Sequence, residues 1–169
     1  MSIRKIARLG HPLLRKKAAA VPVELISGQE IQGIIQDLFE TVLDSDGAGL
    51  AAPQIHESKR IVILDLEDGN GFQVWINPVL EALSDEWIIT YEGCLSVPGL
   101  RGAVARVSAV RVQAFNEKAE EITVMLDNFP AIVAQHECDH LDGILFVDRV
   151  EPGTLCFLEE YQKYLIDLE

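Results

Sequence analysis

The stretch Gln-His-Glu-Cys-Asp-His, residues 135–140, constrains the fold more than any other part of the chain. Residues four apart lie on one face of an α-helix, so His136 and His140 can bind one metal ion only if this stretch is helical. A catalytic ion of this kind commonly takes three protein ligands and keeps one position open. The fold must therefore bring a third ligand to this helix from another part of the chain.

The three cysteines differ in their suitability as that third ligand. Cys138 lies about 160° from His140 around the helix, so we expect it to be a small buried side chain on the far face. Cys94 lies in Glu-Gly-Cys-Leu-Ser, residues 92–96, where small and apolar neighbours would let a metal approach its thiolate. Cys156 lies in an amphipathic C-terminal segment, and we expect it to pack in the core.

The motif at residues 135–140 is also compatible with two functions that do not use Cys94 and Glu137 together. A zinc endopeptidase would take its third ligand downstream of the motif, and Cys94 would be dispensable; the candidates there are Asp142, Asp148 and Glu151. A structural metal module without activity would have no reason to keep Glu137, which is not a ligand. Oxidation of a metal-bound Cys94 is expected as a side effect, not as a function.

Length and composition indicate one globular domain spanning residues 1–169, with 49% hydrophobic and 24% charged residues. There are 27 acids and 14 Lys and Arg, so the formal net charge is −13, which disfavours nucleic-acid binding. No apolar run reaches the roughly 20 residues that span a bilayer. The first residues lack the apolar core of a signal peptide, so we expect a cytoplasmic protein without membrane association.

Periodicity predicts an α+β fold, with mainly antiparallel β-sheets packed around a central motif helix and helices near both ends. The predicted helices are a short one after Gly10, one from a capping box at 27–30 to about Asp44, one from Pro130 to about Gly143, and one over 154–165. Strands are predicted over 60–66, 73–76, 87–91, 104–115 and 121–126, with a loop at 47–54, a turn at Asn77-Pro78 and a hairpin around Asn116.

Three segments together resemble the signature motifs of the peptide deformylase family. They are Gly-Ala-Gly-Leu-Ala-Ala-Pro-Gln (47–54), Glu-Gly-Cys-Leu-Ser (92–96) and Gln-His-Glu-Cys-Asp-His (135–140), in the family's order. Further matches lie at 10–15, 97–102 and 141–148, so the resemblance extends from Ile3 to about Val150. The family is bacterial or organellar, and the missing presequence favours the bacterial form. One departure is Asn128, where the family often has Gly.

The resemblance implies an enzyme that removes the formyl group from the initiator methionine of nascent polypeptides and releases formate. It implies Cys94, His136 and His140 as ligands of Fe²⁺, which Ni²⁺, Co²⁺ or Zn²⁺ can replace. The metal would activate a water near neutral pH, and Glu137 would pass the water's proton to the leaving amine. The side chain of Gln54 and the backbone N–H of Leu95 match the family's oxyanion donors.

Five further residues are expected to contact the substrate. Gly47 and Gly49 would allow close approach of the backbone, although an ordinary loop is the alternative. Phe129, Ile132 and Val133 precede His136 by seven, four and three residues, near its face of the helix. They would form walls of a methionine pocket or would simply belong to the core.

Three charged residues are expected to support the ligands. Asp139 would orient a ligand or pair with an arginine, and Glu92 and Arg106 would form a similar buried pair. An exposed salt bridge is the alternative for each.

The C-terminal tail bears on the ribosome as a partner. Some bacterial deformylases are thought to dock on the ribosome through a basic C-terminal helix. Here the tail carries acids at Glu159, Glu160, Asp167 and Glu169, which suit ribosomal RNA poorly. We therefore expect only transient or weak contact with the ribosome.

Overall fold

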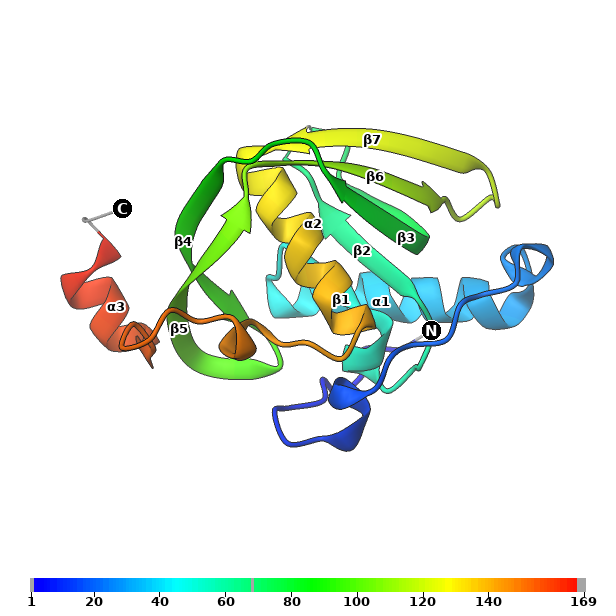
Figure 1. The fold of residues 1–169 in the computed structure, drawn as a ribbon. Coiled ribbons are helices and arrows are strands. Elements are labelled where there is room, and N and C mark those ends of the chain that lie inside the picture. Colours follow the sequence, from blue (N-terminus) through cyan, green and yellow to red (C-terminus); the bar gives the residue numbers. More distant parts are fainter. Residues whose placement is uncertain (1, 68, 167–169) are drawn as a thin grey trace.

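The structure is a computed structural model that describes residues 2–67 and 69–166 (Figure 1). The helices are α1 Gln29–Ser45, α2 Asn128–Leu141 and α3 Leu158–Tyr164, with 3-10 turns η1 Pro12–Arg15, η2 Val23–Leu25, η3 Ala52–Ile55 and η4 Phe146–Asp148. The strands are β1 Gly49–Ala51, β2 Ile61–Asp65, β3 Phe72–Ala82, β4 Trp87–Cys94, β5 Val97–Val107, β6 Ala109–Phe115, β7 Glu121–Asp127 and β8 Cys156–Phe157.

Two antiparallel sheets enclose the motif helix. One sheet has the strand order β1-β2-β3-β6-β7 and the other has the order β4-β5-β8. In Figure 1, α2 lies between β4 and β5 on one side and the larger sheet on the other, and α1 crosses the lower part of the molecule. The predicted α+β fold with antiparallel sheets is confirmed.

Strand β2 of the larger sheet is buried on both faces because a helix packs against each one. Val62 and Leu64 of β2 pack in a cluster with Ala134 and Leu141 of α2. The alternate residues of β2, Ile61 and Ile63, pack in a second cluster with α1 and contact residues such as Leu38 and Val42. Successive strand residues point to opposite faces, so one short apolar strand stabilises both layers. Each such side chain contributes about 1.5–3 kcal/mol on burial.

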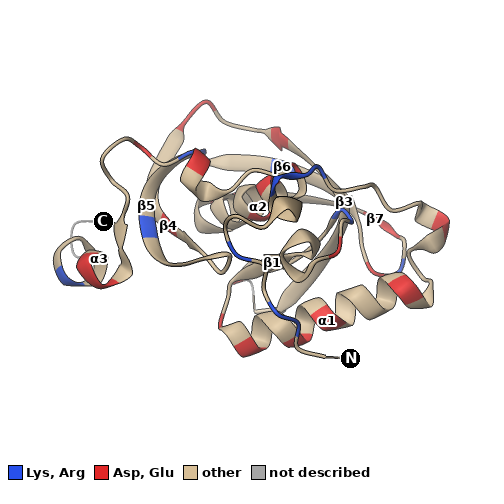
Figure 2. Cartoon of the chain, turned by 90° about the horizontal axis from the view of Figure 1, so that it is seen from below, with Lys and Arg blue, Asp and Glu red and all other residues tan. Residues whose placement is uncertain are grey.

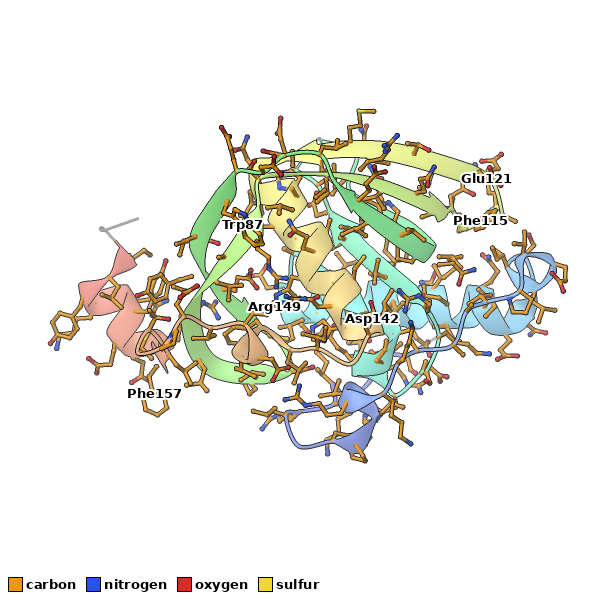
Figure 3. The ribbon with its side chains drawn as sticks, viewed as in Figure 1. Trp87, Phe115, Glu121, Asp142, Arg149 and Phe157 are labelled. Carbon is orange, nitrogen blue, oxygen red and sulfur yellow. The ribbon has the colours of Figure 1, made fainter. Side chains whose placement is uncertain are left out.

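Several predicted strand boundaries were wrong. The strand predicted over 104–115 is two strands, β5 and β6, which separate at Ser108 and enter different sheets. The turn predicted at Asn77-Pro78 lies inside β3, where the pairing with β6 shifts register between Ile76 and Val79. Part of the loop predicted at 47–54 is the short strand β1. Apolar alternation alone does not mark these breaks, because they depend on which strand lies alongside. The hairpin around Asn116 is confirmed, and its ends, Phe115 and Glu121, pair as Figure 3 shows.

The helices also differ in detail from their predictions. The capping box at 27–30 does not form, because Gly28 is the N-cap of α1 and makes no side-chain cap. The C-terminal helix is shorter than predicted and follows the two-residue strand β8. Asn128 opens α2 with φ 52°, a left-handed conformation that Gly and Asn adopt most readily. This backbone conformation explains how Asn replaces the Gly that the family often has there.

Charge is distributed unevenly over the surface. Figure 2 shows acidic positions along α1 and on α3. Among residues 2–67 and 69–166, no helix is long and apolar enough to cross a membrane. The tail residues Asp167 and Glu169, on which the ribosome prediction partly depends, lie outside the described residues.

Candidate metal centre

Cys94, His136 and His140 come together although 42 residues separate the first two in sequence. Their ligand atoms all lie within 4.8 Å of one another. The Sγ of Cys94 is 3.3 Å from Nε2 of His140, and both side chains are buried. One thiolate and two imidazoles suit a divalent transition metal. The residues therefore fit the metal that their pattern implies.

An irregularity in the β4–β5 ladder places Cys94 at this point. Glu92 pairs with Gly102 but Cys94 pairs with Val97, so Gly93 lies opposite residues 98–101 of β5. Extra residues on one strand bend the ladder and re-aim the side chains beside it. The N-terminal segment holds the backbone on either side of the site through two hydrogen bonds. Ala7 N–H donates to Gln54 O and Leu9 N–H donates to Ser96 O, both at 2.8 Å.

Glu137 projects into the same site with an unsatisfied carboxylate oxygen. Its Oε2 is buried and has no hydrogen-bond partner among the described residues. A Cβ on Gly49 would lie 2.8 Å from Oε1 of Glu137, so only glycine at that position leaves room for the carboxyl group. Burial raises the pKa of Glu137 from 4.5 to about 7. A group with this pKa can accept and return a proton near neutral pH.

Gln54 is fixed with its amide group beside Cys94. Its Oε1 accepts from the N–H of Ala51 at 2.8 Å, which turns Nε2 toward Ser96 Oγ at 3.1 Å and Cys94 Sγ at 3.7 Å. This orientation presents N–H donors to the site. Leu95 follows Cys94, and its side chain packs so close to Gly47 that a Cβ there would lie 2.9 Å from Leu95 Cδ1.

A chain of ion pairs leads away from His136. Nδ1 of His136 lies 2.8 Å from Oε2 of Glu92, which leaves Nε2 of the ring for a metal. Arg106 binds both oxygens of Glu92, at 2.8 and 3.0 Å, and Oδ2 of Asp139 at 2.6 Å. Arg149 then binds both oxygens of Asp139, at 2.6 and 2.7 Å. Figure 3 labels Arg149 beside α2.

These contacts make the surroundings of His136 negative. Burial opposes ionisation of Glu92, but hydrogen bonds from Arg106 and His136 outweigh it and lower the pKa of Glu92 to about 2. Burial likewise opposes a charged His136, yet Cys94 and Glu92 raise its pKa well above 6.5. Burial lowers the pKa of His140. Groups that favour a proton on His136 also favour a metal cation in its place.

The site opens into a cavity of about 480 Å³. The predicted residues that line it are Gly47, Gly49, Gln54, Glu92, Cys94, Leu95, Phe129, Ile132, Val133, His136 and Glu137. Ile132 and Val133 are buried, whereas Phe129 is 45% exposed and lies at the rim. The three apolar residues thus lie in the wall of this cavity.

Several cavity residues were missed by the sequence reasoning. They include Asp46, Tyr91, Arg101 and Leu158. The matched segment 97–102 contains Arg101 and was a usable signal for that residue. No signal marked Leu158, because its place at the cavity depends on long-range packing of α3, such as that of Tyr161 on Tyr91.

The remaining candidates lie away from the metal. Cys138 is buried and lies outside the possible metal-binding group, which confirms the prediction of a small buried side chain that does not share the ion. Burial raises the pKa of its thiol. Cys156 is only partly buried in β8, so the prediction of a core residue was wrong. Asp142 pairs with Arg60, and Asp148 pairs with Arg15. Among the residues that the structure describes, only Cys94, His136 and His140 form a possible metal-binding group, so a downstream ligand lacks support.

Comparisons with known proteins agree with this geometry. The family model for polypeptide deformylase matches residues 3–154. The chain is 40% identical over 164 residues to a peptide deformylase of Leptospira biflexa, covering 92% of each. The crystal structure of peptide deformylase from Thermotoga maritima matches with a TM-score of 0.84 and 35% identity, over 90% of this chain and 100% of that one. The Met-Ala-Ser-bound class I type b peptide deformylase from Acinetobacter baumannii matches at 0.81 and 33%, over 88% and 99%.

Both the matched length and the identities far exceed what a shared fold alone would give. The family match also includes all three ligand candidates and Glu137. The chain therefore belongs to the polypeptide deformylase family.

Proposed function

We propose that this protein hydrolyses the N-formyl group from the initiator methionine of nascent polypeptides and releases formate. The observation that carries the proposal is the buried carboxyl of Glu137 in one cavity with Cys94 and His136, which form a ligand group with His140. Among the described residues, Oε2 of Glu137 has no hydrogen-bond partner. A structural metal site needs no such group. Its presence supports an enzyme over a metal module without activity.

Cys94, His136 and His140 would hold the metal, and we propose Fe²⁺ as the native ion, with Ni²⁺, Co²⁺ or Zn²⁺ able to replace it. A divalent ion there supplies Lewis-acid chemistry, lowering the pKa of a water molecule and polarising the formyl oxygen. Glu92 orients the ring of His136 through its 2.8 Å contact with Nδ1. Arg106 holds Glu92 ionised, so the ring keeps one orientation.

Glu137 would move the proton. Its carboxylate takes a proton from the attacking water and returns it to the amine of methionine as the C–N bond breaks. A pKa near 7 suits both steps, because the group neither holds nor releases the proton too strongly. The room left by Gly49 lets the carboxyl reach the reacting atoms.

Two donors would stabilise the developing oxyanion. Gln54 offers Nε2, which its contact with Ala51 N–H keeps directed toward Cys94. Leu95 would offer its backbone N–H. Donors that are already oriented stabilise charge as it develops, without a reorganisation cost.

Specificity for methionine would come from the cavity wall. Ile132, Val133 and Phe129 present apolar carbon to an unbranched thioether. The relative from Acinetobacter baumannii was solved with Met-Ala-Ser bound, which is the peptide left after deformylation of its formyl derivative. This supports a tripeptide as a test substrate.

The direct test is formate release from formyl-Met-Ala-Ser by protein purified without oxygen, with metal analysis of the same sample. We expect release with Fe²⁺, Ni²⁺ or Co²⁺ bound. Cys94→Ser should lose metal and activity together, whereas Cys138→Ala should keep both. Absence of formate with any of these ions bound would overturn the proposal.

We further propose that the enzyme acts in the cytoplasm, where nascent chains emerge, and that it contacts ribosomes weakly. The acids Glu159 and Glu160 in the first turn of α3 support this, because they repel ribosomal RNA. A pull-down with ribosomes should recover little protein. Salt-sensitive recovery that disappears when the tail is deleted would contradict it.

A further inference from the structure

Arg101 lines the same cavity as Cys94, His136 and Glu137, and none of the steps above uses it. Its guanidinium lies against Gly93, the residue before Cys94, where the register of the β4–β5 ladder shifts. A Cβ at Gly93 would lie 1.5 Å from Nη1 and 2.2 Å from Cζ of Arg101. Glycine at this position is therefore what allows the cation to lie beside the metal centre.

Most of the N–H donors of the Arg101 guanidinium have no partner among the described residues. Its one hydrogen bond in the described chain runs from Nη1 to the carbonyl of Leu100 at 3.2 Å. No described carboxylate lies within 4.0 Å of it, whereas ion pairs engage Arg4, Arg15, Arg60, Arg106, Arg111 and Arg149. A guanidinium carries five N–H donors in a planar fork that matches a carboxylate.

The acids of the cavity do not neutralise this charge. Glu92 is bound by Arg106 and His136, Glu137 lies at the reacting centre, and Asp46 is exposed at the C-cap of α1. The protein as a whole carries a formal net charge of −13 and repels anions. Arg101 is thus a local attractive point for a negative group in an otherwise unfavourable field.

The position of the charge sets which substrate residue it can reach. Cζ of Arg101 lies 2.2 Å from the place of a Gly93 Cβ, and neighbouring Cα atoms are about 3.8 Å apart, so the cation lies within about 8 Å of the Cys94 Cα. An extended peptide advances about 3.3–3.6 Å per residue. A peptide that has its formyl group at the metal and runs toward Arg101 would reach the guanidinium at its second or third residue.

We propose that Arg101 is a specificity-determining residue that binds a carboxylate on the second or third residue of the substrate. This rests on the proposed deformylase function. The carboxylate would be an Asp or Glu side chain in a nascent chain, or the C-terminus of a short peptide. Arg101 would affect substrate binding, and it takes no part in proton transfer.

The test compares peptides that differ only in charge. Formyl-Met-Ala-Ser and its C-terminal amide test the terminal carboxylate, and formyl-Met-Ala-Glu-amide and formyl-Met-Ala-Gln-amide test the side chain. For the unaltered enzyme we expect KM to be about tenfold lower for the charged member of at least one pair, as one charge-assisted hydrogen bond would give. Which pair responds identifies the source of the carboxylate.

The variants assign that preference to Arg101. In Arg101→Gln the KM ratio should fall to about one while kcat with the neutral peptides stays unchanged, and Arg101→Lys should keep part of the preference. Lys118→Gln removes the same charge from an exposed turn and should keep the whole preference. The affinities of the product Met-Ala-Ser and of its C-terminal amide give a second readout, because their binding can be compared without turnover.

The outcomes separate the two proposals. One outcome would overturn the role of Arg101 only. In it, all peptides release formate, and the KM ratio between charged and neutral peptides is the same in the unaltered enzyme and in Arg101→Gln. A preference for neutral peptides in the unaltered enzyme would overturn it as well. No release from any peptide with metal bound would overturn the deformylase function itself.

Discussion

The two sides of α2 are held by different forces. Toward the larger sheet, Ala131, Ala134 and Leu141 pack against apolar strand residues. Toward β4 and β5, His136 and Asp139 join a buried network of charges through Glu92 and Arg106. Hydrophobic contact is not directional, so it can set where the helix lies but not how an imidazole ring is turned. Charged hydrogen bonds have defined geometry and can orient the ring.

This difference implies that changes on the two sides should affect different properties. Substitutions on the apolar side should lower the free energy of unfolding and leave the activity of each folded molecule intact. Substitutions on the charged side should alter metal binding or turnover. Four variants, taken from the largest expected effect to the smallest, would test this difference between the apolar and the charged side of α2.

Glu137→Gln should give the largest effect, a decrease in kcat of about 10²–10⁴-fold, because an amide cannot accept the water's proton. The variant should still fold and bind metal, since Glu137 is not a ligand. Steady-state formate release and metal content measure both properties. The neighbouring Cys138→Ala is the matched control and should keep its turnover. A fully active Glu137→Gln would refute the proposed mechanism.

Arg106→Met should destabilise the protein by about 3–5 kcal/mol, because it removes the buried cation that pairs with both Glu92 and Asp139. Glu92 then keeps only His136, and Asp139 keeps only the half-exposed Arg149. Urea unfolding measures this value. Metal affinity should also fall, since His136 loses its orienting partner. Arg149→Met is the control at the exposed end of the same network, and we expect a loss of about 1 kcal/mol or less. Equal losses in the two variants would contradict a buried, directional role for Arg106.

Leu141→Ala should destabilise the protein by about 2–5 kcal/mol through the cavity it leaves between α2 and the larger sheet. The kcat/KM of the folded enzyme should remain close to that of the unaltered protein. Urea unfolding and an assay at low temperature, where the variant is folded, measure the two values. A matching loss of kcat/KM would show that the apolar side also controls the geometry of the site.

Asp148→Asn should have the smallest effect and should appear only in acid. Partial burial of Asp148 opposes ionisation, but the hydrogen bond from Arg15 outweighs it and lowers its pKa below 3.8. A lowered pKa contributes stability above the unfolded value, and this stability is lost as the pH falls through the folded value. The variant should therefore lose less stability than the unaltered protein between pH 5 and about pH 3, by up to about 1 kcal/mol for this half-exposed pair. Identical acid unfolding of the two proteins would contradict the prediction.

Local patterns predicted much of the site because its central element is local. The histidine spacing predicted a helix with two ligand candidates on one face, and the structure has α2 there with both rings beside Cys94. The apolar periodicity of residues 31–43 predicted α1 for the same reason, since a helix repeats every few residues. Strand ends were predicted less well. The break at Ser108 depends on β5 and β6 joining different sheets, and no pattern within 104–115 records that.

By itself, the sequence determined the chemistry available to this protein: two histidines on one helical face, an adjacent glutamate, and one cysteine in a small-residue segment. Periodicity and residue type act over a few residues, so a single chain segment is enough to reveal them. Only the tertiary structure decided what these groups contact. It produced the register shift that sets Arg101 against Gly93, the space at Gly49 that admits Glu137, and the ion pairs from Glu92 to Arg149. Those contacts join residues far apart in sequence, and their distances depend on how two sheets and a helix pack together.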